Sequence, residues 1–194
     1  MKKLHYIALI AVAFLFADCD TNDDGFYNNV YAEVPNLVAM DAHSNTYTVG
    51  EKLYLSADFS RYLPDGIRTL DAFETTGATE FAFSYVIEKQ ISGGDWETVS
   101  LDENLLDIVK GNAYSSGPYV YAICEYNDVD ETYEYRMGFP LLAAGTYRLS
   151  YGYNSESLNS VEIRSISPPT RLFLNIDSLV TGIDAAGYYH FTVN

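Results

Sequence analysis

The stretch Glu80–Gln90, EFAFSYVIEKQ, decides the fold class of this chain. Its large side chains alternate with smaller or polar ones and would lie on one face of an extended strand: Phe81, Phe83, Tyr85 and Ile87. A period of two over a run of this length is typical of a half-buried β-strand. Gly93 and Gly94 then separate it from a second run, 96–101, so the two runs predict a hairpin.

Further alternating or apolar runs recur at short intervals between turn residues such as Pro64-Asp65-Gly66, Pro168-Pro169 and Gly187. These predicted strands are 46–49, 53–57, 119–126, 131–139, 145–153, 161–166, 171–176 and 188–193, after a first extended segment, 26–40. The sequence therefore predicts an all-β fold, a single antiparallel β-sandwich of nine or ten short strands with an Ig-like architecture.

Two segments break the strand pattern. Residues 60–79 are interpreted as a long loop with a helical turn around 70–73. Residues 102–110 carry apolar side chains at helical spacing, which predicts one or two helical turns that end at Gly111 as a C-terminal cap.

The N-terminus has the pattern of an export signal. Lys2 and Lys3 precede an apolar run, 4–17, and Cys19 follows at once. A positive start followed by a short apolar run is typical of a signal peptide, and the run is too short for a membrane span of about 20 residues. The alternative is a buried core helix, which the position beside the first methionine disfavours.

Residues 16–19, Phe-Ala-Asp-Cys, resemble a bacterial lipobox, although Asp18 stands where a small residue is usual. Paired acids after the cysteine, Asp23 and Asp24, resemble the surface-export tag of lipoproteins in the Bacteroidota, including flavobacteria. The resemblance implies lipid attachment, with acyl chains such as palmitate, at Cys19. It also implies a lipid-anchored protein of the outer membrane, displayed at the cell surface. Asp20 leaves open a competing interpretation, retention at the inner membrane.

These features predict three parts: a signal peptide at 1–18, an acidic lipidated tether at 19–29 and the β-domain at 30–194. The chain has 27 acidic and 11 basic residues, a net charge of −16. A polyanion would be repelled, so nucleic acid is excluded as a partner. Cys124 is the one cysteine besides Cys19, which rules out a disulfide framework and predicts a buried, apolar role for Cys124.

Tyrosine is unusually frequent, with 18 residues. Exposed tyrosines can form a rigid amphipathic platform for sugars or proteins. The candidates for ligand binding are Tyr114, Tyr119, Tyr121, Tyr151 and Tyr153. The alternative is that these residues simply cover sheet faces, because tyrosine is a good strand former.

Two acidic clusters carry oxygen ligands of the kind that calcium binds. Asp20, Asn22 and Asp24 match the start of a calcium loop, but Tyr31 stands at the twelfth position, where the loop needs an acid. The other cluster, Asp128, Asp130 and Glu131, lies in a predicted hairpin turn and is a weak candidate. The sequence thus assigns no metal and no cofactor, with calcium left open.

Motifs for catalysis are missing: there is no phosphate loop, nucleophile elbow or zinc-protease helix. The expected function is therefore that of a non-catalytic surface module that binds glycans or envelope proteins. A structural, assembly or adhesion component of the envelope is the alternative, and a hydrolase ranks third.

Overall fold

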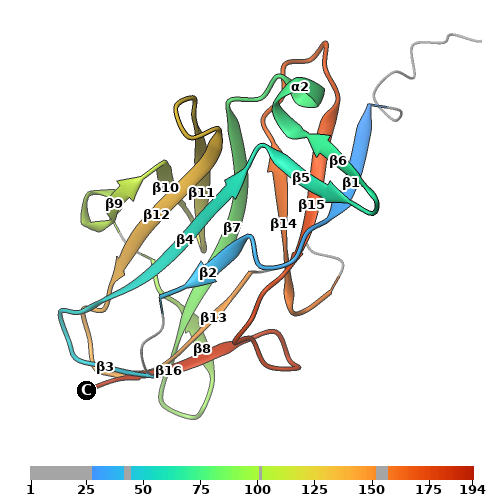
Figure 1. Cartoon of the computed structure of the whole chain (residues 1–194). Coiled ribbons are helices and arrows are strands. Elements are labelled where there is room, and N and C mark those ends of the chain that lie inside the picture. Colours follow the sequence, from blue (N-terminus) through green and yellow to red (C-terminus); the bar gives the residue numbers. More distant parts are fainter. Residues whose placement is uncertain (1–27, 42–44, 101, 152–156) are drawn as a thin grey trace, which may run out of the picture.

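The computed structural model describes residues 28–41, 45–100, 102–151 and 157–194. Over these residues the fold is all-β, as predicted (Figure 1). The strands are β1 (Asn29–Glu33), β2 (Val38–Met40), β3 (Thr46–Tyr47), β4 (Lys52–Ser60), β5 (Tyr62–Asp65), β6 (Arg68–Asp71), β7 (Glu80–Gln90), β8 (Trp96–Thr98), β9 (Asp107–Lys110), β10 (Asn112–Ser116), β11 (Tyr119–Asn127), β12 (Thr132–Pro140), β13 (Gly145–Ser150), β14 (Ser160–Ser165), β15 (Phe173–Leu179) and β16 (Tyr189–Val193). The helical elements of the described residues are α2 (Ala72–Thr76) and a 3-10 turn, η1 (Glu103–Leu105).

The strands are more numerous than the nine or ten expected, and the sheet is mixed rather than purely antiparallel. Its main path runs β1-β15-β14-β7-β11-β12-β4-β2 and curls on itself, with shorter strands attached along it (Figure 1). The β1–β15 and β3–β16 pairs are parallel. The two-sheet, Ig-like sandwich stays a prediction.

Strand β7 lies at the centre of this arrangement, with the bounds that the sequence predicted. Its first half pairs with β11 on one edge and β14 on the other, and its second half pairs with β8 and β13. The predicted hairpin to β8 is confirmed, as is the hairpin of β11 and β12. Strand β7 therefore connects β11 and β14 with β8 and β13.

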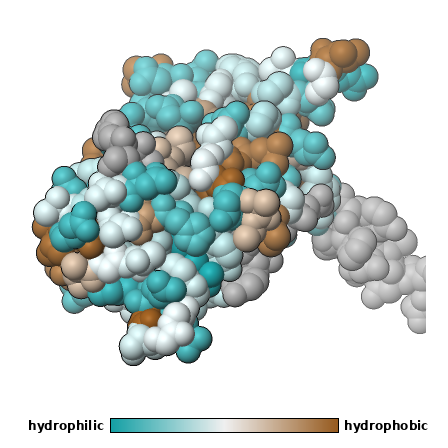
Figure 2. Space-filling model, turned by 90° about the horizontal axis from the view of Figure 1, so that it is seen from below, coloured by the Kyte–Doolittle hydropathy of each residue, from teal (hydrophilic) through white to brown (hydrophobic). Residues whose placement is uncertain are grey.

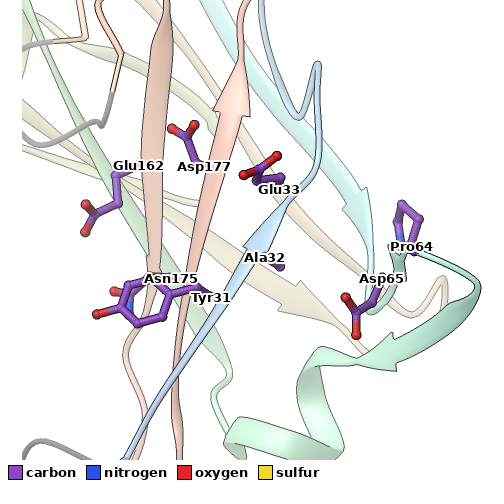
Figure 3. A pocket seen from close by; sticks show the side chains of 9 residues that line it. Tyr31, Ala32, Glu33, Pro64, Asp65, Glu162, Asn175 and Asp177 are labelled. Atoms are coloured by element: carbon purple, nitrogen blue, oxygen red, sulfur yellow. The ribbon is translucent and has the colours of Figure 1, made fainter.

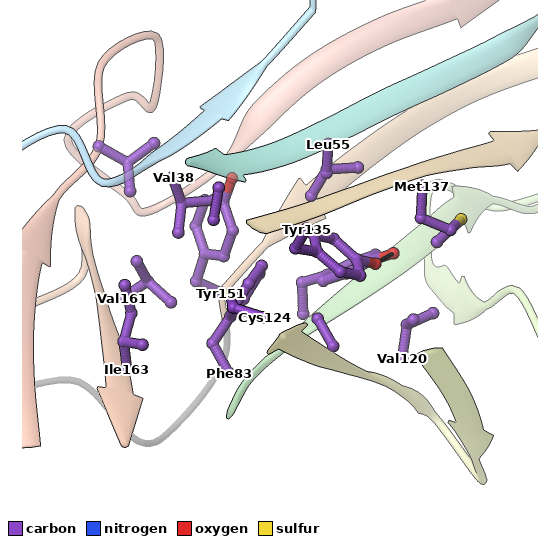
Figure 4. Packing of buried hydrophobic residues seen from close by; sticks show 14 of the residues in the cluster. Val38, Leu55, Phe83, Val120, Cys124, Tyr135, Met137, Tyr151, Val161 and Ile163 are labelled. Carbon is purple, nitrogen blue, oxygen red and sulfur yellow. Dashed lines mark hydrogen bonds between the residues drawn. The ribbon is translucent and has the colours of Figure 1, made fainter. Parts of the chain in front are cut away.

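The alternating residues of β7 form the middle of the core. Phe81, Phe83, Tyr85 and Ile87 are all buried. They meet the inward side chains of β12 across the core: Phe81 packs on Tyr133 with ring centroids 4.6 Å apart. Phe83 packs on Tyr135 at 5.3 Å. Figure 4 shows part of this cluster, in which Cys124 is also buried, as predicted. Burial raises the pKa of the Cys124 thiol far above its usual range, so the thiol stays protonated.

The prediction of a long loop over 60–79 was wrong, but helix α2 overlaps the helical turn predicted around 70–73. The segment folds into the β5–β6 hairpin and helix α2, although the predicted turn at Pro64-Asp65-Gly66 is present. Leu63 anchors the hairpin because its side chain is buried. Asp71 starts the helix by accepting a hydrogen bond from the Glu74 N–H at 3.0 Å. Arg61, in the bend between β4 and β5, donates from its Nε to the same carboxylate at 2.9 Å.

Replacing Asp71 with alanine should lower the free energy of unfolding by about 1 kcal/mol at pH 7, because the helix loses its cap. The Arg61 guanidinium holds the pKa of Asp71 below its usual value. The stabilisation is therefore present at neutral pH and is lost as the pH falls below about 4 toward the folded-state pKa. Urea unfolding at pH 7 and pH 2.5 measures this. A wild-type–variant difference of the same size at both pH values would contradict the assignment.

The predicted helical turns over 102–110 are only partly present. A single 3-10 turn, η1, is followed by strand β9. Leu105 and Val109 are exposed, and Leu106 alone of the three predicted apolar positions is buried, so these residues do not form a buried helix face. Gly111 does not cap a helix. It joins β9 to β10 with φ +66°, and a Cβ at this position would lie 2.3 Å from the Ile123 carbonyl oxygen.

The predicted signal peptide and most of the predicted tether, with Cys19, Asp23 and Asp24, lie outside the described residues. Within the described part of the chain, no helix has the length and apolar character needed to cross a membrane.

Candidate functional site

Six neighbouring strands of the large sheet present one face away from the core: β10, β11, β7, β14, β15 and β1. Residues paired directly across adjacent strands point to the same face of a sheet. Three rows of such pairs cross this face: Tyr114, Tyr121 and Ser84; then Ala82, Arg164, Asn175 and Tyr31; then Glu162, Asp177 and Glu33. We call this surface the outer face.

Three hollows lie along the outer face. The first is about 290 Å³, and its lining includes Tyr119 and Arg148. The second is about 370 Å³ and is lined by residues such as Tyr121 and Arg164. The third is about 420 Å³ and shares Glu162 with the second. Tyr119 and Tyr121 are two residues apart on β11 and join the first hollow to the second. We call the three together the outer groove.

An arginine is fixed in the first hollow. The Arg148 guanidinium stacks over the rings of Trp96 and Tyr188, at 4.3 Å and 3.9 Å from their centroids. Its Nε donates to Glu88 Oε2 at 2.6 Å across the β13–β7 pair. Stacking and the ion pair restrict the side chain. The hollow therefore offers a preorganised wall of aromatic rings and charged groups.

Tyr121 lines the second hollow, in the middle of the groove. Its side chain is 39% exposed, and Ser84 and Arg164 line the same hollow. Burial raises the pKa of Tyr121, and Glu80 adds to the rise while Arg164 opposes it. The phenol is therefore protonated at neutral pH and can donate a hydrogen bond as well as offer its ring.

The third hollow is acidic. Figure 3 shows Tyr31 beside Asn175, with the carboxylates of Glu162, Asp177 and Glu33 along the neighbouring strands. The turn of the β5–β6 hairpin, with Asp65, closes the hollow from across β1. We call this part of the groove the acidic hollow.

The structure brings three of the five predicted tyrosines together. Tyr114 and Tyr121 form a direct cross-strand pair, and Tyr119 lies two residues from Tyr121 on the same face. The prediction for Tyr151 was wrong: its side chain is only 4% exposed and packs in the core beside Phe83 (Figure 4). The alternation of β13 sends Tyr147, Leu149 and Tyr151 inward. Tyr153 lies outside the described residues.

The buried hydroxyl of Tyr151 has no hydrogen-bond partner among the described residues. Replacing Tyr151 with phenylalanine should therefore leave the free energy of unfolding unchanged or raise it by about 1 kcal/mol. Tyr133→Phe is the matched comparison, because the Tyr133 hydroxyl donates to the Ala78 carbonyl at 2.8 Å. That variant should lose about 1 kcal/mol. Chemical denaturation of both variants checks the pair, and equal losses would contradict it.

The acidic turn of the β11–β12 hairpin is held by its own amide side chain. Asn127 Oδ1 accepts the Val129 N–H at 3.0 Å, and its Nδ2 donates to Asp130 Oδ2 at 3.1 Å. Glu131 pairs with Arg61. Among the described residues no group of three or more acidic, histidine or cysteine side chains has the geometry of a metal site, so Asp128, Asp130 and Glu131 form a polar turn there.

Several residues of the groove were missed by the sequence analysis: Tyr31, Arg148, Glu162, Arg164, Asn175, Asp177 and Tyr188. They come from strands far apart in the chain, and no local motif joins them. Only the polar positions of the predicted strands 161–166 and 171–176 could have indicated some of these residues, because alternation places such positions on the face opposite the core.

Four carboxyl groups of the described residues have a clearly lowered pKa: Asp71, Asp107, Glu134 and Asp184. In the first three the pKa is lowered chiefly by side-chain hydrogen bonds from cationic partners, and in Asp184 chiefly by the Tyr188 N–H.

No protein-family model matches the chain, and no curated protein matches its sequence. Among solved structures, the human F-spondin reeler domain (fragment 1) is similar at 7% identity, over 87% of this chain and 96% of that chain. The TM-score of that likeness is 0.36.

Proposed function

We propose that this protein is a non-catalytic, cell-surface glycan-binding module whose binding site is the outer groove. The observation that carries the proposal is the placement of Tyr114, Tyr119 and Tyr121 on one exposed face, where two hollows meet. Tyrosine rings give a sugar ring a flat apolar surface at low cost in side-chain entropy. The groove extends over several hollows, which suits a chain of sugars rather than a single one.

The polar groups of the groove suit hydroxyl-rich ligands. Carboxylates accept hydrogen bonds from sugar hydroxyls, and Arg148 and Arg164 donate to them. The hollows also contain Glu88, Glu162 and Asp177, in a chain of net charge −16. A polyanionic polysaccharide would be repelled over this surface. We therefore propose glycans without acidic sugars as ligands.

We further propose that the module is anchored to the outer membrane through acyl chains on Cys19, with Asp23 and Asp24 as the export tag. Intact-mass measurement and surface proteolysis of cells test this with wild-type protein and the Cys19→Ala variant. We expect the wild-type protein to be acylated and accessible to protease on cells, and the Cys19→Ala variant to be soluble. An unmodified wild-type protein in the periplasm would overturn the anchor and leave the groove proposal untouched.

The glycan proposal is tested by co-sedimentation of the purified protein with a panel of insoluble polysaccharides, neutral, amine-bearing and acidic. Binding to at least one neutral or amine-bearing member, reduced in Tyr121→Ala, is expected. Tyr62→Ala is the control, because Tyr62 is 46% exposed and does not line the groove, although Pro64 and Asp65 of the same strand do. Failure to bind any member of the panel would sink the proposal.

An assembly or adhesion role is the second candidate. Strand β1 ends the sheet path, and the nearby hairpin carries Ile67 with its side chain fully exposed. Such an edge can add a strand from a partner. On the face seen in Figure 2, however, hydrophobic residues form separate patches among hydrophilic ones. Cross-linking in cells distinguishes the two roles, since an envelope protein linked through β1 would favour assembly.

A further inference from the structure

The acidic hollow differs from the rest of the outer groove in its charge. Its lining includes four carboxylates, Glu33, Asp65, Glu162 and Asp177, and no lysine or arginine. None of the ion pairs in the described part of the chain involves Glu33, Asp65 or Asp177. The hollow therefore has a negative potential, to which Glu33, Asp65 and Asp177 contribute without a partner among these ion pairs.

Two buried acceptors in its wall add an independent observation. Asn175 is only 5% exposed, and its Oδ1 has no hydrogen-bond partner among the described residues. Its Nδ2 donates to Asn29 Oδ1 at 3.3 Å, which orients the amide. Asp177 Oδ1 is likewise buried without a partner. Unsatisfied buried acceptors are costly, and their place beside a hollow indicates a ligand that supplies N–H donors.

The carboxylates also lie in one row across three strands, because Glu162 pairs with Asp177 and Asp177 with Glu33. Like charges directly opposite one another in a sheet destabilise it, and a bound cation would remove that cost. Tyr31, 72% exposed, lies two residues from Glu33 on β1, in the neighbouring row, and can stack on a sugar ring or a cation.

We propose that the acidic hollow is a subsite for a protonated amino sugar, so that the groove prefers glycans with free amines. This deepens the proposed function and rests on it. An ammonium group offers three N–H donors to a wall rich in carboxylate and amide oxygens, and the ring that carries it stacks on Tyr31. A compact metal ion fits less well, because the described acidic side chains form no cluster with metal geometry.

Calorimetric titration with three β-1,4-linked hexasaccharides tests the subsite: the hexamers of glucosamine, glucose and N-acetylglucosamine. They share a backbone and differ at one ring position, as amine, hydroxyl or acetamide. At low salt and a pH below the amine pKa, the glucosamine hexamer should bind roughly tenfold tighter or more. The preference should shrink with added salt and with rising pH, as the ammonium loses its charge.

Substitutions in the acidic hollow test whether its carboxylates cause the preference for the glucosamine hexamer. Asp177→Asn and Glu33→Gln remove charge at nearly constant shape, and each should reduce the preference for the amine while the glucose hexamer binds as before. Asp58→Asn is the matched control, because Asp58 is exposed on β4, in the part of the sheet across the core from β7. An equal loss in the control would show a general charge effect and overturn the subsite.

The outcomes separate the two proposals. If the glucose and glucosamine hexamers bind equally, the amine subsite is wrong and the glycan site stands. If no hexamer binds and Ca²⁺ alone raises the melting temperature of wild type but not of Asp177→Asn, the hollow is a metal site and the amine subsite is overturned. If a lysine-rich peptide binds in place of the hexamers, the hollow takes a protein partner, and both proposals fail.

Discussion

Replacing Phe81 with alanine should lower the free energy of unfolding by about 3–5 kcal/mol, the usual cost of deleting a buried aromatic side chain. Phe81 is fully buried and packs against the rings of both Phe59 and Tyr133, so the cavity would open where β4, β7 and β12 meet. A typical domain has only about 5–15 kcal/mol of total stability. The variant should therefore be close to unfolded at 37 °C.

Chemical denaturation followed by tyrosine and tryptophan fluorescence measures this loss. Ile67→Ala is the control, since its side chain is fully exposed and its removal should change stability by less than about 0.5 kcal/mol. A Phe81→Ala variant as stable as the control would show that β7 is not the centre of the core.

Replacing both Tyr119 and Tyr121 with alanine should lower glycan affinity by roughly 100-fold. Each truncated ring removes a contact worth about 1–2 kcal/mol at a binding surface, and about 1.4 kcal/mol corresponds to a factor of ten. Both rings are more than a third exposed, so their loss leaves the core intact. The double variant should therefore unfold at the wild-type denaturant concentration.

Calorimetry with the tightest ligand of the polysaccharide panel measures the affinity, and Tyr62→Ala provides an exposed tyrosine outside the groove as control. Undiminished affinity in the double variant, with normal folding, would remove β11 from the binding site.

The all-β class and the central strand could be predicted because both depend on local alternation. The run from Glu80 to Gln90 has one apolar face, and that face became the core. The β5–β6 hairpin could not be predicted. Its strands carry Pro64, Asp65 and several polar side chains. It folds because Leu63 is buried, the Arg61–Asp71 pair closes its base, and Arg61 also pairs with the distant Glu131.

The candidate site was predictable only where it is local. The abundance of tyrosine made Tyr114, Tyr119 and Tyr121 candidates, but the β10–β11 hairpin that puts them on one face was not predicted. The prediction for Tyr151 was wrong because a tyrosine on a strand can point to either face, and only the register of β13 against β7 sends this one inward. The acidic hollow joins β1 to β15, its parallel partner over 120 residues away, and to β14, which pairs with β15; no local pattern reveals the pairing of such distant segments.

The most direct test of the glycan site is a titration of the isotope-labelled protein with the glucose and glucosamine hexamers, followed by amide ¹H–¹⁵N spectra. We expect signals of Ser84, Tyr119, Tyr121 and Arg164 to shift in a saturable way, with those of Glu33 and Asp177 joining them for the glucosamine hexamer. Spectra unchanged at millimolar ligand, or shifts confined to the outward residues of β4 and β12, would contradict the proposal that the outer groove binds glycans.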